Sequence, residues 1–233
     1  MAMIAVAGCG AVTPEPEPDA APDPIEIPVD CGNHTLDPGE DCDGTPDCPR
    51  TCHVTPAAGT VAVRFRGGVT LVMDPQGAFG GQLAVAAPLW GRIVYATSLP
   101  DQSADASVGD YPYTNAGGRD SRGIWLQAGL WSFHPDRGTG ILRVGNGASG
   151  GDGFYAQLGN GAVSPPVIGL QSIVVDLRDP TQSALATDAL PASWFPPAAS
   201  WMDRHLYIQG DNSSVAWFVD AILDEVTLET PAP

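Results

Sequence analysis

Short segments of alternating apolar and polar residues, ended by glycine or proline, occupy most of the chain between residues 55 and 230. Alternation of apolar and polar residues with a period of two is typical of a half-buried β-strand with one face in a core. Residues 61–73 show it clearly, and the parity continues across Gly67 and Gly68, which predict a bulge or bend. We expect the odd-numbered apolar residues to be buried: Val61, Val63, Phe65, Val69, Leu71 and Met73.

Seven further strands are predicted by the same pattern. They cover residues 90–97, 123–133, 140–145, 153–158, 171–178, 204–209 and 214–229. Only residues 181–190 read as a short helix, confined by prolines on both sides. The 28 glycines and 23 prolines favour short strands joined by turns. We therefore expect residues 55–230 to fold as an all-β domain, an antiparallel β-sandwich of jelly-roll-like type.

The charge excludes several classes of partner. With 27 acidic and 10 basic residues, the formal charge is -17, which repels nucleic-acid phosphates and anionic membrane surfaces. Every basic residue is arginine, so lysine-dependent chemistry such as a P-loop or a Schiff base is absent. Neither nucleic acid nor a nucleotide is expected as a partner.

The first nine residues end in the run Val6-Ala7-Gly8-Cys9. An aliphatic residue, two small residues and a cysteine resemble the end of a bacterial lipoprotein signal. The resemblance implies a lipid on Cys9 and attachment to the outer membrane or cell surface of a Gram-negative bacterium. The basic start expected of an export signal does not precede this run. An ordinary apolar terminus with an unpaired cysteine is the alternative.

Residues 10–30 form a linker by composition. Residues 11–30 hold six prolines and six acidic residues but no basic one. Proline favours the polyproline II conformation and like charges repel, so we expect an extended tether of about 3.1 Å per residue. Such a segment would hold a following domain away from a surface.

Residues 31–52 carry the remaining cysteines, Cys31, Cys42, Cys48 and Cys52. A segment this short cannot bury a core, so covalent bridges are expected to hold it together. A four-cysteine zinc site is the alternative, but such sites usually show two closely spaced pairs. We expect two disulfides, in one of three pairings that the sequence does not separate.

Two resemblances support export. Cys31-Gly32-Asn33, Leu36-Asp37-Pro38-Gly39-Glu40 and Cys42-Asp43 resemble the short cysteine-rich repeat of myxobacterial and related secreted proteins. Asp74-Pro75, Gly80-Gly81-Gln82 and Gly151-Asp152-Gly153-Phe154 are similar to an uncharacterised β-rich domain of exported bacterial proteins. The first implies a disulfide module at the cell surface, and neither implies a catalytic residue.

Catalytic motifs are weak throughout the chain. Residues 145–150 fit G-x-G-x-x-G, but a strand-like segment follows where a dinucleotide site needs a helix, so we expect a glycine-rich loop. The same stretch places Ser149 in a G-x-S-x-G match that also lacks the required helix. His205 follows it, with Asp176, Asp179 and Asp188 between, as a triad would need. We expect no triad in an all-β domain.

Calcium is the one cofactor that the composition suggests. Glu40, Asp41, Asp43 and Asp47 cluster in the cysteine-rich segment, and Asp176 with Asp179 is a second candidate. Carboxylates and loop carbonyls are the hard oxygen ligands that calcium prefers. Neither cluster follows a known calcium loop, and solvated acidic turns are the alternative.

Two of the six tryptophans are candidate ligand contacts. Trp125, Trp131 and Trp217 lie in predicted strands and are expected in the core. Trp194 and Trp201 lie instead in a proline-rich stretch, so we expect either surface stacking on a sugar or packing against the edge of the domain.

These features predict a lipid-anchored surface protein with a non-catalytic binding or envelope-organising role. Extracellular polysaccharide or an envelope protein is the expected partner, besides the membrane that holds the lipid. One alternative is an extracellular polymer hydrolase with an aspartate-based acid/base site, which raised carboxyl pKa values would favour. The other is a purely structural envelope component.

Overall fold

A computed structural model describes residues 56–115, 122–134, 138–148, 150–159, 162–164, 169–212 and 215–231. Cys9, the linker and the cysteine-rich module with its four acidic residues lie outside these ranges. Within them the chain is all-β and antiparallel, as expected, and has no α-helix. No helix in these ranges is long and apolar enough to cross a membrane.

Eleven strands form one sheet, in the order β3-β6-β7-β9-β10-β11-β1-β2-β4-β5-β8. Their bounds are β1 Thr60–Met73, β2 Pro88–Ala96, β3 Val108–Asn115, β4 Gly123–Ala128, β5 Trp131–His134, β6 Gly138–Ala148, β7 Gly151–Gly159, β8 Ala162–Ser164, β9 Gly169–Asp179, β10 Asp203–Asn212 and β11 Val215–Glu229. A three-residue 3₁₀ turn, η1 Ala198–Ser200, precedes β10.

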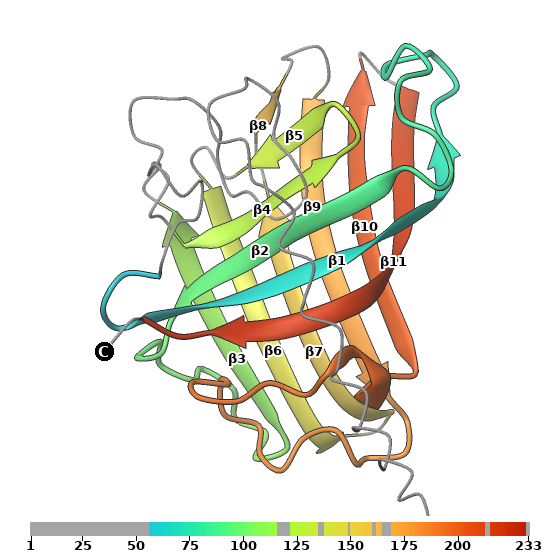
Figure 1. The fold of residues 1–233 in the computed structure, drawn as a ribbon. Helices are drawn as coiled ribbons and strands as arrows, with labels where there is room; N and C mark the ends of the chain where they lie inside the picture. The colour runs from blue at the N-terminus through green and yellow to red at the C-terminus, as the bar shows by residue number, and fades with distance from the viewer. Residues whose placement is uncertain are drawn as a thin grey trace, which may run out of the picture.

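The sheet curls on itself (Figure 1). β8 lies between β7 and β9 along the chain, and these two strands pair with each other, yet β8 pairs with β5 at the far end of the strand order. The curl therefore puts β1, β2, β4 and β5 across from β6, β7, β9 and β10 (Figure 1). The described strands belong to one sheet, so a sandwich of two sheets is not confirmed.

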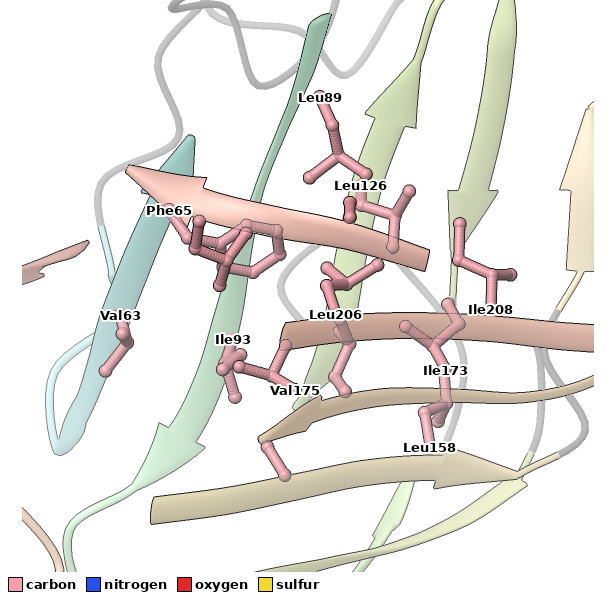
Figure 2. Packing of buried hydrophobic residues seen from close by; sticks show 14 of the residues in the cluster. Val63, Phe65, Leu89, Ile93, Leu126, Leu158, Ile173, Val175, Leu206 and Ile208 are labelled. Atoms are coloured by element: carbon pink, nitrogen blue, oxygen red, sulfur yellow. The ribbon is translucent and has the colours of Figure 1, made fainter. Parts of the chain in front are cut away.

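The core fills the space inside the curl. Figure 2 shows Val63, Phe65 and Ile93 from β1 and β2 pointing toward Val175 and Leu206 from β9 and β10. All five side chains are at most 2% exposed. At about 25 cal/mol per Å² of apolar surface, burial on this scale supplies the main favourable free energy of the fold.

Beyond Val69, a register shift in β1 reverses which side chains face the core and which face outward. Val69 pairs with Ala221 and Leu71 pairs with Asp220, so Thr70 is an extra residue that turns the following side chains over. Val72 packs against the core, while Leu71 and Met73 are 43% and 55% exposed. Their expected burial was wrong. The bulge expected near Gly67 is present, as a shift between Arg66 and Gly67.

Residues 181–190 form a loop, and the expected short helix was wrong. The buried carboxylate of Asp179 accepts hydrogen bonds from the N–H groups of Thr181, Ser183 and Ala184 at 2.9, 2.8 and 3.0 Å. The Leu185 N–H, which a helix would direct to the Thr181 carbonyl oxygen, donates instead to the carboxylate of Asp152 at 2.8 Å. Gln182 has a φ of 60°, outside the helical range, so the segment does not wind into a helix.

The loop then crosses one end of the curled sheet (Figure 1). Phe195 and Trp201 turn inward and are 6% and 2% exposed. Phe195 packs edge-on against Phe154 of β7, with the ring centroids 4.9 Å apart. The loop therefore closes that end of the core.

β3 was missed as a strand, since it is not among the strands predicted from the alternating pattern. Tyr111 and Tyr113 point inward, and the Tyr111 hydroxyl donates to the Asp188 carbonyl oxygen at 3.0 Å. Among the described strands β3 pairs only with β6 and ends the strand order, and Pro112 occupies its middle.

Candidate functional site: an aromatic and acidic face of the sheet

The outward face of β7, β9, β10 and β11 carries a continuous group of aromatic and charged side chains. In an antiparallel sheet, residues directly opposite each other share a face. One such row crosses β3, β6, β7, β9, β10 and β11, and contains Asp110, Arg143, Tyr155, Asp176, His205 and Ile222. The next row contains Gln157, Val174, Tyr207, Asp220 and Leu71.

Three rings on this face stack in a line, and we call them the ring row: His205, Tyr207 and Phe218. The His205 and Tyr207 rings are 5.4 Å apart and 6° from parallel. The Tyr207 and Phe218 rings are 5.8 Å apart with an angle of 27°. Because β10 and β11 are paired along their length, the rings are held on a rigid base. Each of the three is partly exposed.

A hydrogen bond fixes the first ring. His205 Nδ1 lies 3.0 Å from Asp220 Oδ1. An ionised carboxylate only accepts, so Nδ1–H is the donor, and this orients the imidazole beside Tyr207.

Carboxylates surround the ring row. Asp176 accepts two bonds from Arg178, at 3.0 and 2.7 Å, and lies directly opposite His205. Asp203 lies opposite Arg178. The pKa of the Tyr207 hydroxyl is raised, first by burial and then by the negative charges of Asp220, Asp176 and Asp203, against the lowering effect of Arg178. The face therefore has negative potential at its central ring.

Exposed apolar side chains border the ring row toward β1. Met73 lies opposite Phe218, and Leu71 lies opposite Asp220, both on the segment of β1 that the bulge turns outward. Ile222 is next to His205 across β10 and β11 and is 38% exposed. The face thus combines stacking rings, apolar contact area and hydrogen-bonding groups.

Of the two tryptophans considered as ligand contacts, Trp201 packs against the domain, which was the alternative to a ligand contact. It is 2% exposed, packs against Phe195, and its indole N–H donates to the Pro196 carbonyl oxygen at 3.3 Å. A buried ring offers no stacking surface, so Trp201 is not a ligand contact. Trp194 is 58% exposed and has neither of the two contacts that hold Trp201.

Trp125 and Trp131 do not share one strand, because a turn at Gly129 and Leu130 separates β4 from β5. Trp131 and Trp217 are buried as expected, and each packs edge-on against Phe79, at 5.2 and 5.0 Å. Trp125 faces outward and is only half-buried, with the Arg92 guanidinium 5.7 Å from its ring. Since Arg92 is 3% exposed, this contact belongs to packing.

The candidate calcium groups are not brought together. Asp179 points inward and Asp176 outward, so they lie on opposite faces of β9. Glu40, Asp41, Asp43 and Asp47 lie outside the described residues. Across the described ranges, no three His, Cys, Asp or Glu side chains are grouped to hold a metal ion.

The candidate catalytic residues have other roles or lie outside the described residues. Ser149 is among the latter. Residues 145–148 belong to the end of β6, which pairs with the antiparallel β7 and has a register shift between Gly145 and Ala148, so most of the loop expected over residues 145–150 is strand. Hydrogen bonds from Thr181 and Ser183 hold the pKa of Asp179 far below its usual value, whereas a general acid needs a raised one.

Sequence reasoning missed Tyr155, Tyr207 and Phe218. A signal was present, since His205, Tyr207 and Gln209 alternate with the apolar Leu206 and Ile208. That alternation places both rings on the solvent face. The sequence alone does not show that Phe218 and Tyr155 lie beside these rings, because their proximity depends on the strand order. No protein-family model, curated protein or solved structure matches the chain.

Proposed function

We propose that this protein binds an extracellular polysaccharide through the outward face of β7, β9, β10 and β11. The ring row of His205, Tyr207 and Phe218 is the observation that carries the proposal. The role is recognition without catalysis, at the surface of a bacterial cell.

The chemistry of the face suits a sugar chain. A pyranose has an apolar C–H face, which packs on an aromatic ring, and hydroxyl groups at its rim, which need donors and acceptors. Around the rings, Asp176, Asp220 and Gln157 supply acceptors, and Arg178 supplies donors. Because the rings are already stacked and held by the sheet, binding costs little ordering of the protein.

The rest of the chain is consistent with display at a surface. In this proposal Cys9 carries the lipid, residues 10–30 hold the domain away from the membrane, and the cysteines of residues 31–52 form two disulfides. A protein held in this way at the outer membrane or cell surface of a Gram-negative bacterium would meet extracellular polymers.

The test is binding of the full chain to a panel of extracellular polysaccharides, read by isothermal titration. Tyr207→Ala and Phe218→Ala each remove one ring. Stacking is worth a few kcal/mol at most for one ring, so each should weaken binding by about tenfold. Trp194→Ala is the matched control, because it also removes an exposed ring.

Loss of binding in Trp194→Ala alone would contradict the ring row and favour the proline-rich segment instead. No saturable binding to any polymer would contradict the proposal as a whole and favour a purely structural role. Release of reducing sugar ends in the same mixtures would show a hydrolase.

A further inference from the structure

We infer that the polymer bound by this face is built of amino sugars with free, positively charged amino groups. This inference rests on the proposed function and adds the charge of the ligand to it. Charge complementarity at the ring row is its basis.

The charges nearest the central ring are mostly negative. Asp220 lies directly opposite Tyr207 and belongs to the next strand. Asp176 lies one row away, opposite His205, and Asp203 lies two residues before His205 on the same strand. Arg178 is the compensating cation and is shared by two of these carboxylates, since it bonds Asp176 and lies opposite Asp203.

The arrangement suits a sugar ring that carries an ammonium group. Because His205 and Phe218 stack on the two sides of Tyr207, a pyranose would lie over the exposed edges of the ring row, with its substituents toward the side chains around the row. The carboxylates of Asp176 and Asp220 stand on either side of Tyr207, on β9 and β11. An ammonium group is a donor with three hydrogens and a full charge, so bonds to carboxylates are among the stronger ones in proteins.

The same charges disfavour acidic polymers. A uronate bound over the ring row would bring its carboxylate near Asp176 and Asp220, where like charges repel. The formal charge of -17 adds a long-range repulsion that salt screens over about 10 Å at 0.1 M. Neutral sugars would keep the contact with the rings and the hydrogen bonds to the carboxylates but would lack the attraction between opposite charges.

The experiment compares oligomers of equal length and linkage: glucosamine, N-acetylglucosamine, and an oligomer that contains glucuronate. Titrations use the full chain at low and at high salt, below the pKa of the sugar amine. We expect the glucosamine oligomer to bind most tightly, to lose affinity with salt, and to bind more weakly at a pH where the amine is neutral. The N-acetylated oligomer should bind more weakly with little salt dependence, and the glucuronate oligomer least.

Single variants identify the carboxylates. Asp203→Asn should weaken glucosamine binding about fivefold, a loss in the range of one charge pair near water, and leave N-acetylglucosamine binding unchanged. Asp176→Asn should weaken glucosamine binding by more than it weakens N-acetylglucosamine binding. Asp188→Asn is the control of equal net charge, located in the loop that crosses the end of the sheet. Thermal unfolding confirms that the variants fold.

Equal affinity for glucosamine and N-acetylglucosamine would overturn this inference and leave the proposed function standing. No binding of any oligomer would overturn both. Equally tight binding of polylysine that is insensitive to Tyr207→Ala would also overturn the inference, because it would show a general attraction for cations.

Discussion

Asp152 and Asp179 are buried carboxylates that accept hydrogen bonds from backbone N–H groups and hydroxyl groups of nearby loops. They lie opposite each other on β7 and β9 and are 1% and 3% exposed. Asp179 accepts bonds from Thr181, Ser183 and Ala184, and Asp152 from Gly147 and Leu185. A carboxylate that accepts several such bonds is stabilised in its charged form. Two side chains therefore fix the start of the long loop.

Asp179→Asn should lower the melting temperature, because an amide replaces one acceptor oxygen by a donor facing N–H groups. The folded pKa of Asp179 is depressed, so its stabilisation is present above the unfolded value of 3.8 and is lost as the pH falls below it. We expect the difference in melting temperature between wild type and variant to be largest at neutral pH and to decrease below about pH 4. Circular dichroism melts across this range measure it.

The exposed Asp203→Asn is the control and should change the melting temperature little. A difference between wild type and Asp179→Asn that is the same at every pH would contradict the role of the charge.

Trp201 and Trp194 should differ sharply in their effect on stability. Trp201→Ala leaves a cavity beside Phe195 and should cost about 3–5 kcal/mol of unfolding free energy. Trp194→Ala removes a mostly exposed ring and should stay within about 0.5 kcal/mol of wild type. Urea denaturation measures both, and equal values would contradict the placement of Trp201 in the core.

Among the strands, the bulge in β1 has the largest effect on the candidate site. If β1 passed Thr70 without the bulge, Leu71 and Met73 would keep the parity of Val69 and enter the core. With it, they lie on the outward face beside Phe218 and Asp220. One inserted residue thus widens the apolar border of the ring row.

Pairing between β9 and β10 depends on close backbone contact at Gly210. A Cβ there would overlap the Gly169 carbonyl oxygen and the Trp217 ring, so Gly210→Ala should cost about 1–3 kcal/mol. Gly68→Ala is the matched control, because a Cβ there meets nothing within 4 Å. The same denaturation assay compares them, and a stable Gly210→Ala would contradict the tight packing.

The strands were largely predictable from sequence, because alternation with period two survives wherever one face is buried. The alternating pattern gave wrong predictions at three places where local structure interrupts a strand or replaces a helix. These are the bulge at Thr70, the turn beside Gly129, and the loop held by hydrogen bonds to Asp179. The ring row was not predictable as a site, since Tyr155, Tyr207 and Phe218 come together only through the order β7-β9-β10-β11. Propensity and period carry no information on that order.

At the scale of the whole molecule, the proposed lipid on Cys9 decides where the sheet is displayed. Cys9→Ala should move the protein from the membrane fraction to the soluble fraction of the cell envelope, because one thiol would carry the whole attachment. Fractionation followed by immunoblotting measures this, with Trp194→Ala as a control that keeps the thiol. Retention of Cys9→Ala in the membrane fraction would contradict the anchor.

Display of many copies on a cell surface, as proposed, would give the end of the sheet at β3 a further role. Strand edges with free N–H groups are templates on which neighbouring copies pair and aggregate. β3 ends the strand order, and Pro112 at its centre has no N–H to give to an incoming strand. Copies held side by side by lipid anchors would therefore resist zipping together along this edge, and each would remain a separate binding unit.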